Sequence, residues 1–74
     1  MRISHLDGKR VALWGWGREG RAAYRALRSR LPQLPLTVLC DAREAAEVAA
    51  IRDPLLGTNA TITADTLAAF DVVV

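Results

Sequence analysis

A glycine-rich segment near the start of the chain constrains the fold more strongly than any other feature. The run Gly15-Trp16-Gly17-Arg18-Glu19-Gly20 directly follows the apolar segment 11–14 and precedes a segment with helical periodicity. In this G-x-G-x-x-G spacing the first glycine permits a tight turn, the second leaves room for a phosphate, and the third allows the helix to pack closely. The run predicts a strand–turn–helix unit that presents helix N–H groups to an anion. A tight turn that binds nothing is the alternative.

The rest of the chain alternates between helical and strand character. An apolar helical face runs from Gly20 to Leu31, and Pro32 ends it. The sequence then predicts a second strand at 36–40, a second helix at 42–52, a loop at Gly57, a third strand at 60–63, a helical turn at 65–69 capped by Thr63 or Asp65, and a fourth strand at 71–74. This alternation predicts the α/β class, with a Rossmann-like parallel sheet of about four strands and helices on both faces. We expect the second strand beside the first, and the third on the first strand's other side.

An acidic residue stands where a nucleotide-binding fold of this kind needs one. Asp41 follows the second predicted strand, 21 residues after Gly20, and this spacing suits a carboxylate that accepts hydrogen bonds from ribose hydroxyls. The same carboxylate could accept from the N–H of a uracil ring, or cap the helix that begins at residue 42. Arg43 suits a phosphate or the face of a base, and a solvated position in the first helical turn is its alternative.

Four other residues allow predictions about burial. Trp14 and Cys40 end apolar strands and are predicted to be core residues, and we expect no reactivity from the cysteine. For Trp16, packing against the glycine-rich loop is favoured over stacking on a ligand ring. Glu19 favours the helix dipole but would repel a phosphate, so we expect it to face solvent or to pair with an arginine.

The net charge of +2 conceals an uneven distribution. Residues 1–30 carry eight basic and two acidic residues, whereas residues 31–74 carry two basic and six acidic residues. The positive half suggests an anionic partner. A solvated helix face is the more common meaning of an arginine series such as Arg21, Arg25 and Arg28. The overall charge is too small to indicate nucleic acid as the partner.

Length and composition exclude several classes of protein. The chain has 74 residues, 51% of them hydrophobic, which suffices for one small domain with a thin stability margin. One cysteine excludes a disulfide framework, and the apolar stretches are shorter than the ~18 residues of a membrane span. The start of the chain lacks the apolar region of a secretory signal, so we expect a cytoplasmic protein. The valine-rich segment 70–74 is typical of a buried strand and predicts a fragment of a longer protein.

These residues resemble the N-terminal domain of the Mur ligases. The resemblance rests on the leader and loop from Leu6 to Ala22, on Asp41-x-Arg43 after the second strand, and on Ala69-Phe70-Asp71-Val72-Val73-Val74. In the family that last run continues to a Ser-Pro-Gly turn. The resemblance covers the whole chain and is closest to the branch that adds glutamate to UDP-N-acetylmuramoyl-L-alanine. The loop looks most like a variant branch that attaches L-glutamate rather than D-glutamate.

The resemblance implies a function and a set of site residues. Residues 1–74 would form a single N-terminal Rossmann-like domain that binds the UDP part of UDP-N-acetylmuramoyl-L-alanine, with no nucleic-acid or membrane partner. The residues implied at the UDP are Gly15, Gly17, Arg18, Glu19, Gly20, Asp41, Ala42 and Arg43. Of these, residues 17–20 would face the diphosphate and residues 41–43 would hold the uracil. The family often has a hydroxyl residue where Ala42 stands. The ATP, Mg²⁺ and glutamate sites of this ATP-dependent ligase of peptidoglycan synthesis would lie in other domains, so no catalytic or metal-binding residue is implied here.

Two other functions remain open from the residues alone. An NAD(P)-binding domain of an oxidoreductase would use the same loop, and Asp41 would then select NAD. Tyr24 stands where many dinucleotide sites have a small residue, which counts against this alternative. A non-catalytic Rossmann-like regulatory or interaction module would bind neither nucleotide.

Overall fold

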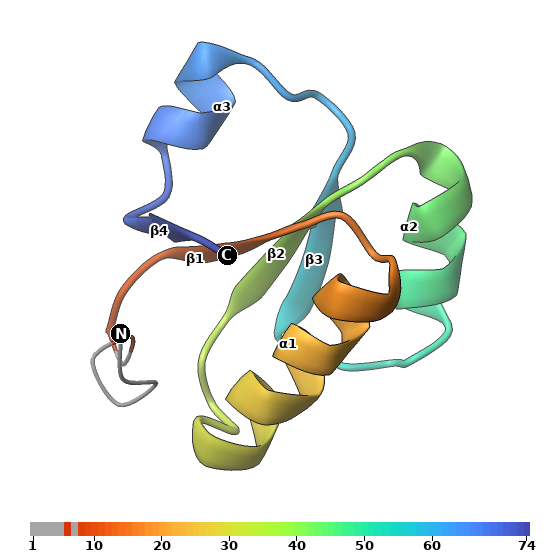
Figure 1. Cartoon of the computed structure of the whole chain (residues 1–74), viewed down its shortest axis with the longest axis vertical. Helices are drawn as coiled ribbons and strands as arrows, with labels where there is room; N and C mark the ends of the chain where they lie inside the picture. The colour runs from red at the N-terminus through yellow and green to blue at the C-terminus, as the bar shows by residue number, and fades with distance from the viewer. Residues whose placement is uncertain (1–5, 7) are drawn as a thin grey trace.

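The computed structural model describes Leu6 and residues 8–74, so His5, to which the sequence assigns no role, and Asp7 of the leader lie outside the described residues. The elements alternate as predicted (Figure 1). In chain order they are β1 (Val11–Trp14), α1 (Arg18–Arg30), β2 (Leu36–Leu39), α2 (Ala42–Ala49), β3 (Leu56–Asn59), α3 (Ala64–Ala68) and β4 (Val72–Val73). The chain therefore belongs to the α/β class, as expected.

The four strands form one parallel sheet in the order β3-β2-β1-β4 (Figure 1). β1 is a central strand, with β2 along one edge and β4 along the other. The predicted parallel, Rossmann-like sheet is confirmed, but the expected position of the third strand is wrong. β3 lies beside β2, and the chain crosses to the other side of β1 only with β4. β3 and β4 are therefore the two edge strands of the sheet, and β1 and β2 are the central ones.

The third strand also begins earlier than predicted. Leu56 pairs with Leu36, and the register continues to Asn59, so Gly57 lies in the strand and not in a loop. The segment 60–63, predicted as the strand, connects β3 to α3. The Asn59 side-chain oxygen accepts a hydrogen bond from Thr61 N at 2.9 Å, and such a turn ends the strand.

The helices begin where their sequence signals indicate, but α2 ends early. Thr63 Oγ1 accepts from Thr66 N, which confirms it as the cap of α3. α2 was expected to continue to Arg52 and instead ends at Ala49. Beyond it, the N–H groups of Ile51 and Arg52 donate to the carbonyl oxygens three residues back rather than four, as in a 3₁₀ turn. Arg52 itself adopts a φ of 60°, a left-handed conformation that ends a right-handed helix. Asp53 precedes Pro54, which also disfavours helical geometry at that point.

The main core lies between the sheet and helices α1 and α2. Its buried side chains are Leu6, Val11, Leu13, Trp16, Leu27, Leu34, Leu36, Val38, Cys40 and Val48. α3 lies away from α1 and α2 (Figure 1) and contributes no buried residue. Trp14 was predicted to be core and is 56% exposed. Because side chains alternate along a strand, Trp14 points away from the face of β1 that Val11 and Leu13 bury under α1 and α2.

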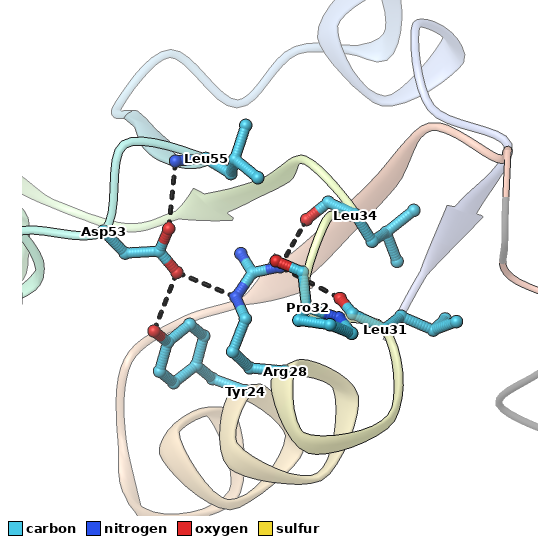
Figure 2. A network of polar contacts seen from close by, with 7 residues as sticks. All are labelled: Tyr24, Arg28, Leu31, Pro32, Leu34, Asp53 and Leu55. Atoms are coloured by element: carbon cyan, nitrogen blue, oxygen red, sulfur yellow. Dashed lines mark hydrogen bonds and ion pairs between the residues drawn. The ribbon is translucent and has the colours of Figure 1, made fainter.

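A half-buried polar network ties α1 to the loops that flank β2 and β3 (Figure 2). The Asp53 carboxylate accepts from Tyr24 OH at 2.8 Å, from Arg28 Nε at 2.8 Å and from Leu55 N at 2.9 Å. Burial alone would raise the pKa of Asp53, but these three donors together hold that pKa below its usual value. Burial and the Asp53 carboxylate raise the pKa of the Tyr24 hydroxyl.

Arg28 completes the network and corrects the expectation that its side chain is solvated. Its Nη1 donates to the carbonyl oxygens of Leu31, Pro32 and Leu34 at 3.1, 3.3 and 2.7 Å. Only 17% of its side chain is exposed, and its guanidinium lies 5.6 Å from the centre of the Tyr24 ring. Arg28 therefore closes the C-terminal end of α1, where a cation also favours the helix dipole.

Candidate functional site

The glycine-rich loop emerges from the carboxyl end of β1 and is fixed to the neighbouring strand. Gly15 has a φ of 82°, the left-handed geometry for which the sharp turn needs a glycine. Its N–H donates to Leu39 O at 2.8 Å, so the start of the loop is attached to the end of β2. The predicted role of Gly15 as the turn residue is confirmed. Ligands of parallel α/β sheets bind at this end of the sheet, beyond the carboxyl ends of the strands.

The third glycine of the loop is required by a close contact. A Cβ atom at position 20 would collide with the carbonyl oxygen of Gly15 and lie 3.1 Å from its carbonyl carbon. The close approach predicted for Gly20 therefore exists, and its partner is the backbone at the end of β1. In contrast, a Cβ atom at Gly17 would meet nothing within 4 Å, so the loop is open at that point.

The N-terminus of α1 differs from those of the other helices. Asp41 and Thr63 cap α2 and α3 with side-chain oxygens, whereas Gly17 at the N-cap of α1 has no side chain to accept from the first turn. An uncapped helix start presents free N–H groups and a partial positive charge. Arg18 and Glu19 in this turn are both exposed. The expected solvent-facing position of Glu19 is confirmed.

Asp41 performs the structural role that the sequence left open for it. Its Oδ1 accepts a hydrogen bond from Glu44 N at 2.8 Å, which is the N-cap geometry of α2. Its Oδ2 makes no hydrogen bond within the described part of the chain. Ala42 and Arg43 are exposed in the following turn. The segment 41–43 thus brings an Asp41 carboxylate oxygen and the exposed residue Arg43 to the carboxyl end of β2, beside the loop.

A residue that the motif analysis did not select joins these two segments. Glu44 Oε2 accepts a hydrogen bond from Trp16 N at 3.1 Å, across 28 residues of sequence. The Asp-x-x-Glu spacing from Asp41 to Glu44 is typical of a capping box, in which the second acid usually bonds back to the cap of its own helix. That spacing was the available signal for Glu44, but it does not reveal a bond to the glycine-rich loop.

Trp16 itself is part of the core. Its side chain is 5% exposed, and its ring packs edge-on against Tyr24 with 5.5 Å between ring centroids. The prediction that Trp16 packs within the protein is confirmed. Cys40, at the end of β2, is likewise buried. Burial raises the pKa of the Cys40 thiol, and the nearby carboxylates of Glu44 and Asp41 raise it further, so no reactive thiolate is favoured here.

Two cavities lie at opposite ends of the strands. A cavity of about 290 Å³ beside the loop is lined by Trp14, Glu19, Gly20, Ala23 and Val74. A larger one of about 440 Å³ lies at the amino ends of the strands, where Lys9, Arg10 and Phe70 contribute to its walls. Parallel α/β sheets bind their ligands at the carboxyl ends of the strands, where the smaller cavity lies. Of the candidate site residues only Glu19 and Gly20 line it, and Asp41, Ala42 and Arg43 do not. The exposed Trp14 ring forms one wall of it.

None of the helices in the described part of the chain combines the length and the apolar character needed to cross a bilayer. Among the same residues, no three side chains of His, Cys, Asp or Glu come together in a way that could hold a metal ion.

The chain is similar over its whole length to curated proteins named UDP-N-acetylmuramoyl-L-alanine--L-glutamate ligase. It is 64% identical to the protein of that name from Xanthomonas campestris pv. campestris (strain 8004) over 74 residues. The identity is 58% for Xylella fastidiosa (strain Temecula1) and 51% for Xanthomonas oryzae pv. oryzae (strain MAFF 311018). In each case the match covers 100% of this chain and 16% of the relative. No family model and no solved structure matches the chain.

Proposed function

The chain belongs to the Mur ligase family, and on that premise we propose that it is the part of a glutamate ligase that holds the UDP portion of UDP-N-acetylmuramoyl-L-alanine. Residues 1–74 would form one UDP-sugar-binding domain. The relatives are named for L-glutamate, so we propose L-glutamate as the amino acid that the whole enzyme adds. The chain spans 16% of the length of these relatives, and most of the enzyme's chemistry would take place elsewhere.

One observation carries this proposal. The uncapped N-terminus of α1 and the capped N-terminus of α2 lie at the carboxyl ends of β1 and β2, which are neighbouring strands. The Trp16–Glu44 hydrogen bond connects them. The first offers free N–H groups to an anion, and the second offers a carboxylate oxygen and a guanidinium. A nucleoside diphosphate needs both kinds of group, because its phosphates are anionic and its base carries N–H donors and carbonyl acceptors.

Each site residue has a specific role in this proposal. The backbone of the loop would receive the diphosphate, with Gly15 making the turn, Gly17 leaving access, and Gly20 allowing the helix to begin beside the strand. The side chains of Arg18 and Glu19 are exposed beside it, and only the arginine favours an anion. The residues proposed at the uracil are Asp41, Ala42 and Arg43. The Oδ2 of Asp41 would accept from the ring N–H while its Oδ1 continues to cap α2. Ala42 supplies no hydroxyl, so it offers only its backbone.

The whole enzyme would use ATP and Mg²⁺ to form an amide bond between its substrate and glutamate. The substrate carboxylate would be activated as an acyl phosphate, which the amino group of glutamate then attacks with loss of phosphate. The described residues of this chain do not fit that chemistry, because they bring together no group that could hold a metal ion. Within this chain the contribution would be to bind and orient the nucleotide end of the substrate.

The substitution Asp41→Asn tests the proposal in the full-length protein. Asparagine caps a helix about as well as aspartate, so α2 should persist. If the side-chain oxygen of the asparagine caps α2, the side-chain N–H₂ would face the N–H of the uracil ring. Two hydrogen-bond donors would then oppose each other. We expect the KM for UDP-N-acetylmuramoyl-L-alanine to rise about 5- to 150-fold, which corresponds to the loss of one buried polar contact.

The matched control is Asp65→Asn, an exposed acid in the first turn of α3 that should leave KM unchanged. Unchanged kinetics in Asp41→Asn would show that Asp41 serves only as a cap. Tight binding of NADH by the wild-type protein, without any response to uridine nucleotides, would refute the proposed ligand.

A further inference from the structure

We propose that Glu44 is a positioning residue that joins the diphosphate-binding and uracil-binding halves of the site into one rigid unit. The inference rests on the proposed function. It concerns a side chain that the motif does not contain and that need not touch the ligand itself.

The contacts form a short chain of hydrogen bonds between the two halves. Asp41 Oδ1 accepts from Glu44 N at 2.8 Å, and Glu44 Oε2 accepts from Trp16 N at 3.1 Å. Glu44 therefore contacts the uracil-side segment with its backbone and the glycine-rich loop with its carboxylate. Any displacement of the loop relative to α2 must break or stretch the second bond.

The loop needs such a support because of its composition. Trp16 lies between Gly15 and Gly17, which have no side chains to pack. The Gly15 N–H is held by Leu39 O, whereas Gly17 is exposed and a Cβ there would meet nothing within 4 Å. Glycine loses more conformational freedom on ordering than any other residue. The Trp16 ring is fixed in the core against Tyr24, and Glu44 fixes its backbone N–H as well. With both ends of this residue held, the loop is preorganised, and ligand binding has less ordering entropy to overcome.

The charge of Glu44 argues against direct contact with the ligand. A carboxylate beside a diphosphate is repulsive, and Glu44 adds to the negative charge of Asp41 at this edge of the sheet. The position in the first turn of α2 compensates for the charge, since the helix dipole favours an anion there. We therefore expect the acceptor oxygen of Glu44, and not its charge, to be the property that matters.

This expectation can be tested with three variants of the full-length protein. Glu44→Ala removes the acceptor, Glu44→Gln keeps an acceptor oxygen without the charge, and Glu47→Ala is the matched control from the exposed side of the same helix. The KM for UDP-N-acetylmuramoyl-L-alanine should rise about tenfold in Glu44→Ala, with kcat and the KM for glutamate unchanged. Glu44→Gln should restore KM to within about twofold of wild type, the size of a modest change in one hydrogen bond.

Amide hydrogen exchange supplies a second readout that kinetics alone cannot give. In Glu44→Ala, exchange should accelerate in the peptide that contains Trp16 and Gly17, and it should stay at the wild-type level in β2. Acceleration in both segments would show that Glu44 acts through overall stability, which overturns the proposal.

The possible failures are distinguishable. If the wild-type protein binds the UDP-sugar and Glu44→Ala binds it equally well, the positioning role is wrong and the proposed function stands. If Glu44→Gln is as impaired as Glu44→Ala, the charge matters and the argument from the acceptor oxygen fails. If the wild-type protein does not bind the UDP-sugar, the proposed function and this inference fail together.

Discussion

Replacing Asp53 by alanine should loosen the connection between α1 and the β2–β3 side of the sheet. The Asp53 carboxylate accepts three hydrogen bonds, and only 13% of its side chain is exposed. Alanine would leave the Tyr24 hydroxyl, the Leu55 N–H and the Arg28 Nε without this acceptor. The guanidinium would keep its bonds to backbone carbonyls but lose its counter-charge.

The magnitude follows from these contacts. All three hydrogen bonds end on an ionised carboxylate, and one hydrogen bond to a charged group contributes about 1.5–3 kcal/mol. Contributions within one network are not additive, so we take as the upper limit the loss of about 3–5 kcal/mol that is typical of breaking a fully buried ion pair. Water can reach part of the Arg28 side chain, which is 17% exposed, and would replace some of these bonds. We expect a loss of about 2–3 kcal/mol in the free energy of opening.

Amide hydrogen exchange of the full-length protein measures this loss locally. Leu36 N donates to Leu55 O at 2.8 Å, so peptides covering 36–39 and 55–59 report on the strands that the network supports. A loss of 2–3 kcal/mol corresponds to exchange that is about 30- to 150-fold faster. Asp71→Ala is the control, because Asp71 also pairs with an arginine but lies on the surface, where its partner Arg10 is 68% exposed.

Two outcomes would refute the reasoning. Equal exchange in Asp53→Ala and wild type would show that the network adds nothing to local stability. Equal acceleration in Asp53→Ala and Asp71→Ala would show that any lost ion pair produces the same effect, so burial would not be the reason for it.

Gly20 and Asp53 lead to two further predictions. Gly20→Ala should displace the loop and weaken binding of the UDP-sugar by at least an order of magnitude, whereas Gly17→Ala should fold normally, because its Cβ meets open space. Binding is measured by titration calorimetry and folding by circular dichroism. Equal folding of the two variants would contradict the close-contact argument. The pKa of Asp53 is lowered on folding, so its stabilisation is complete above the unfolded pKa of about 3.9 and is lost as pH falls through the folded value. The difference in exchange protection between wild type and Asp53→Ala should therefore shrink in acid, and a difference independent of pH would exclude the ionised carboxylate as its cause.

The features that the sequence predicted correctly depend on neighbours along the chain. The turn at Gly15, the cap at Asp41 and the cap at Thr63 each involve residues within a few positions of one another. Local steric and hydrogen-bonding rules are enough to locate such features. The structure brings the predicted loop and the predicted acidic segment to one edge of the sheet, because both follow parallel strands that lie side by side.

The wrong predictions concern pairings between distant segments. β3 was placed four residues too late because Leu56-Gly57-Thr58-Asn59 has weak strand character, and only its pairing with β2 makes it a strand. Trp14 has the composition of a core residue, but its side of the sheet receives no buried residue from α3. Neither the partner strand nor the face of the sheet can be inferred from residues near in sequence.

The uneven charge of the chain takes on a different meaning once the contacts are known. Both ion pairs of the described residues, Arg28–Asp53 and Arg10–Asp71, join the basic first half to the acidic second half. Part of the positive charge that suggested an anionic partner is therefore neutralised within the fold. Arg18, at the open N-terminus of α1, takes part in neither pair and is exposed. Lys9, Arg21, Arg25 and Arg30 are also exposed and take part in neither pair. Arg18 differs from them because it begins α1, so a cation and uncapped backbone N–H groups coincide at the glycine-rich loop.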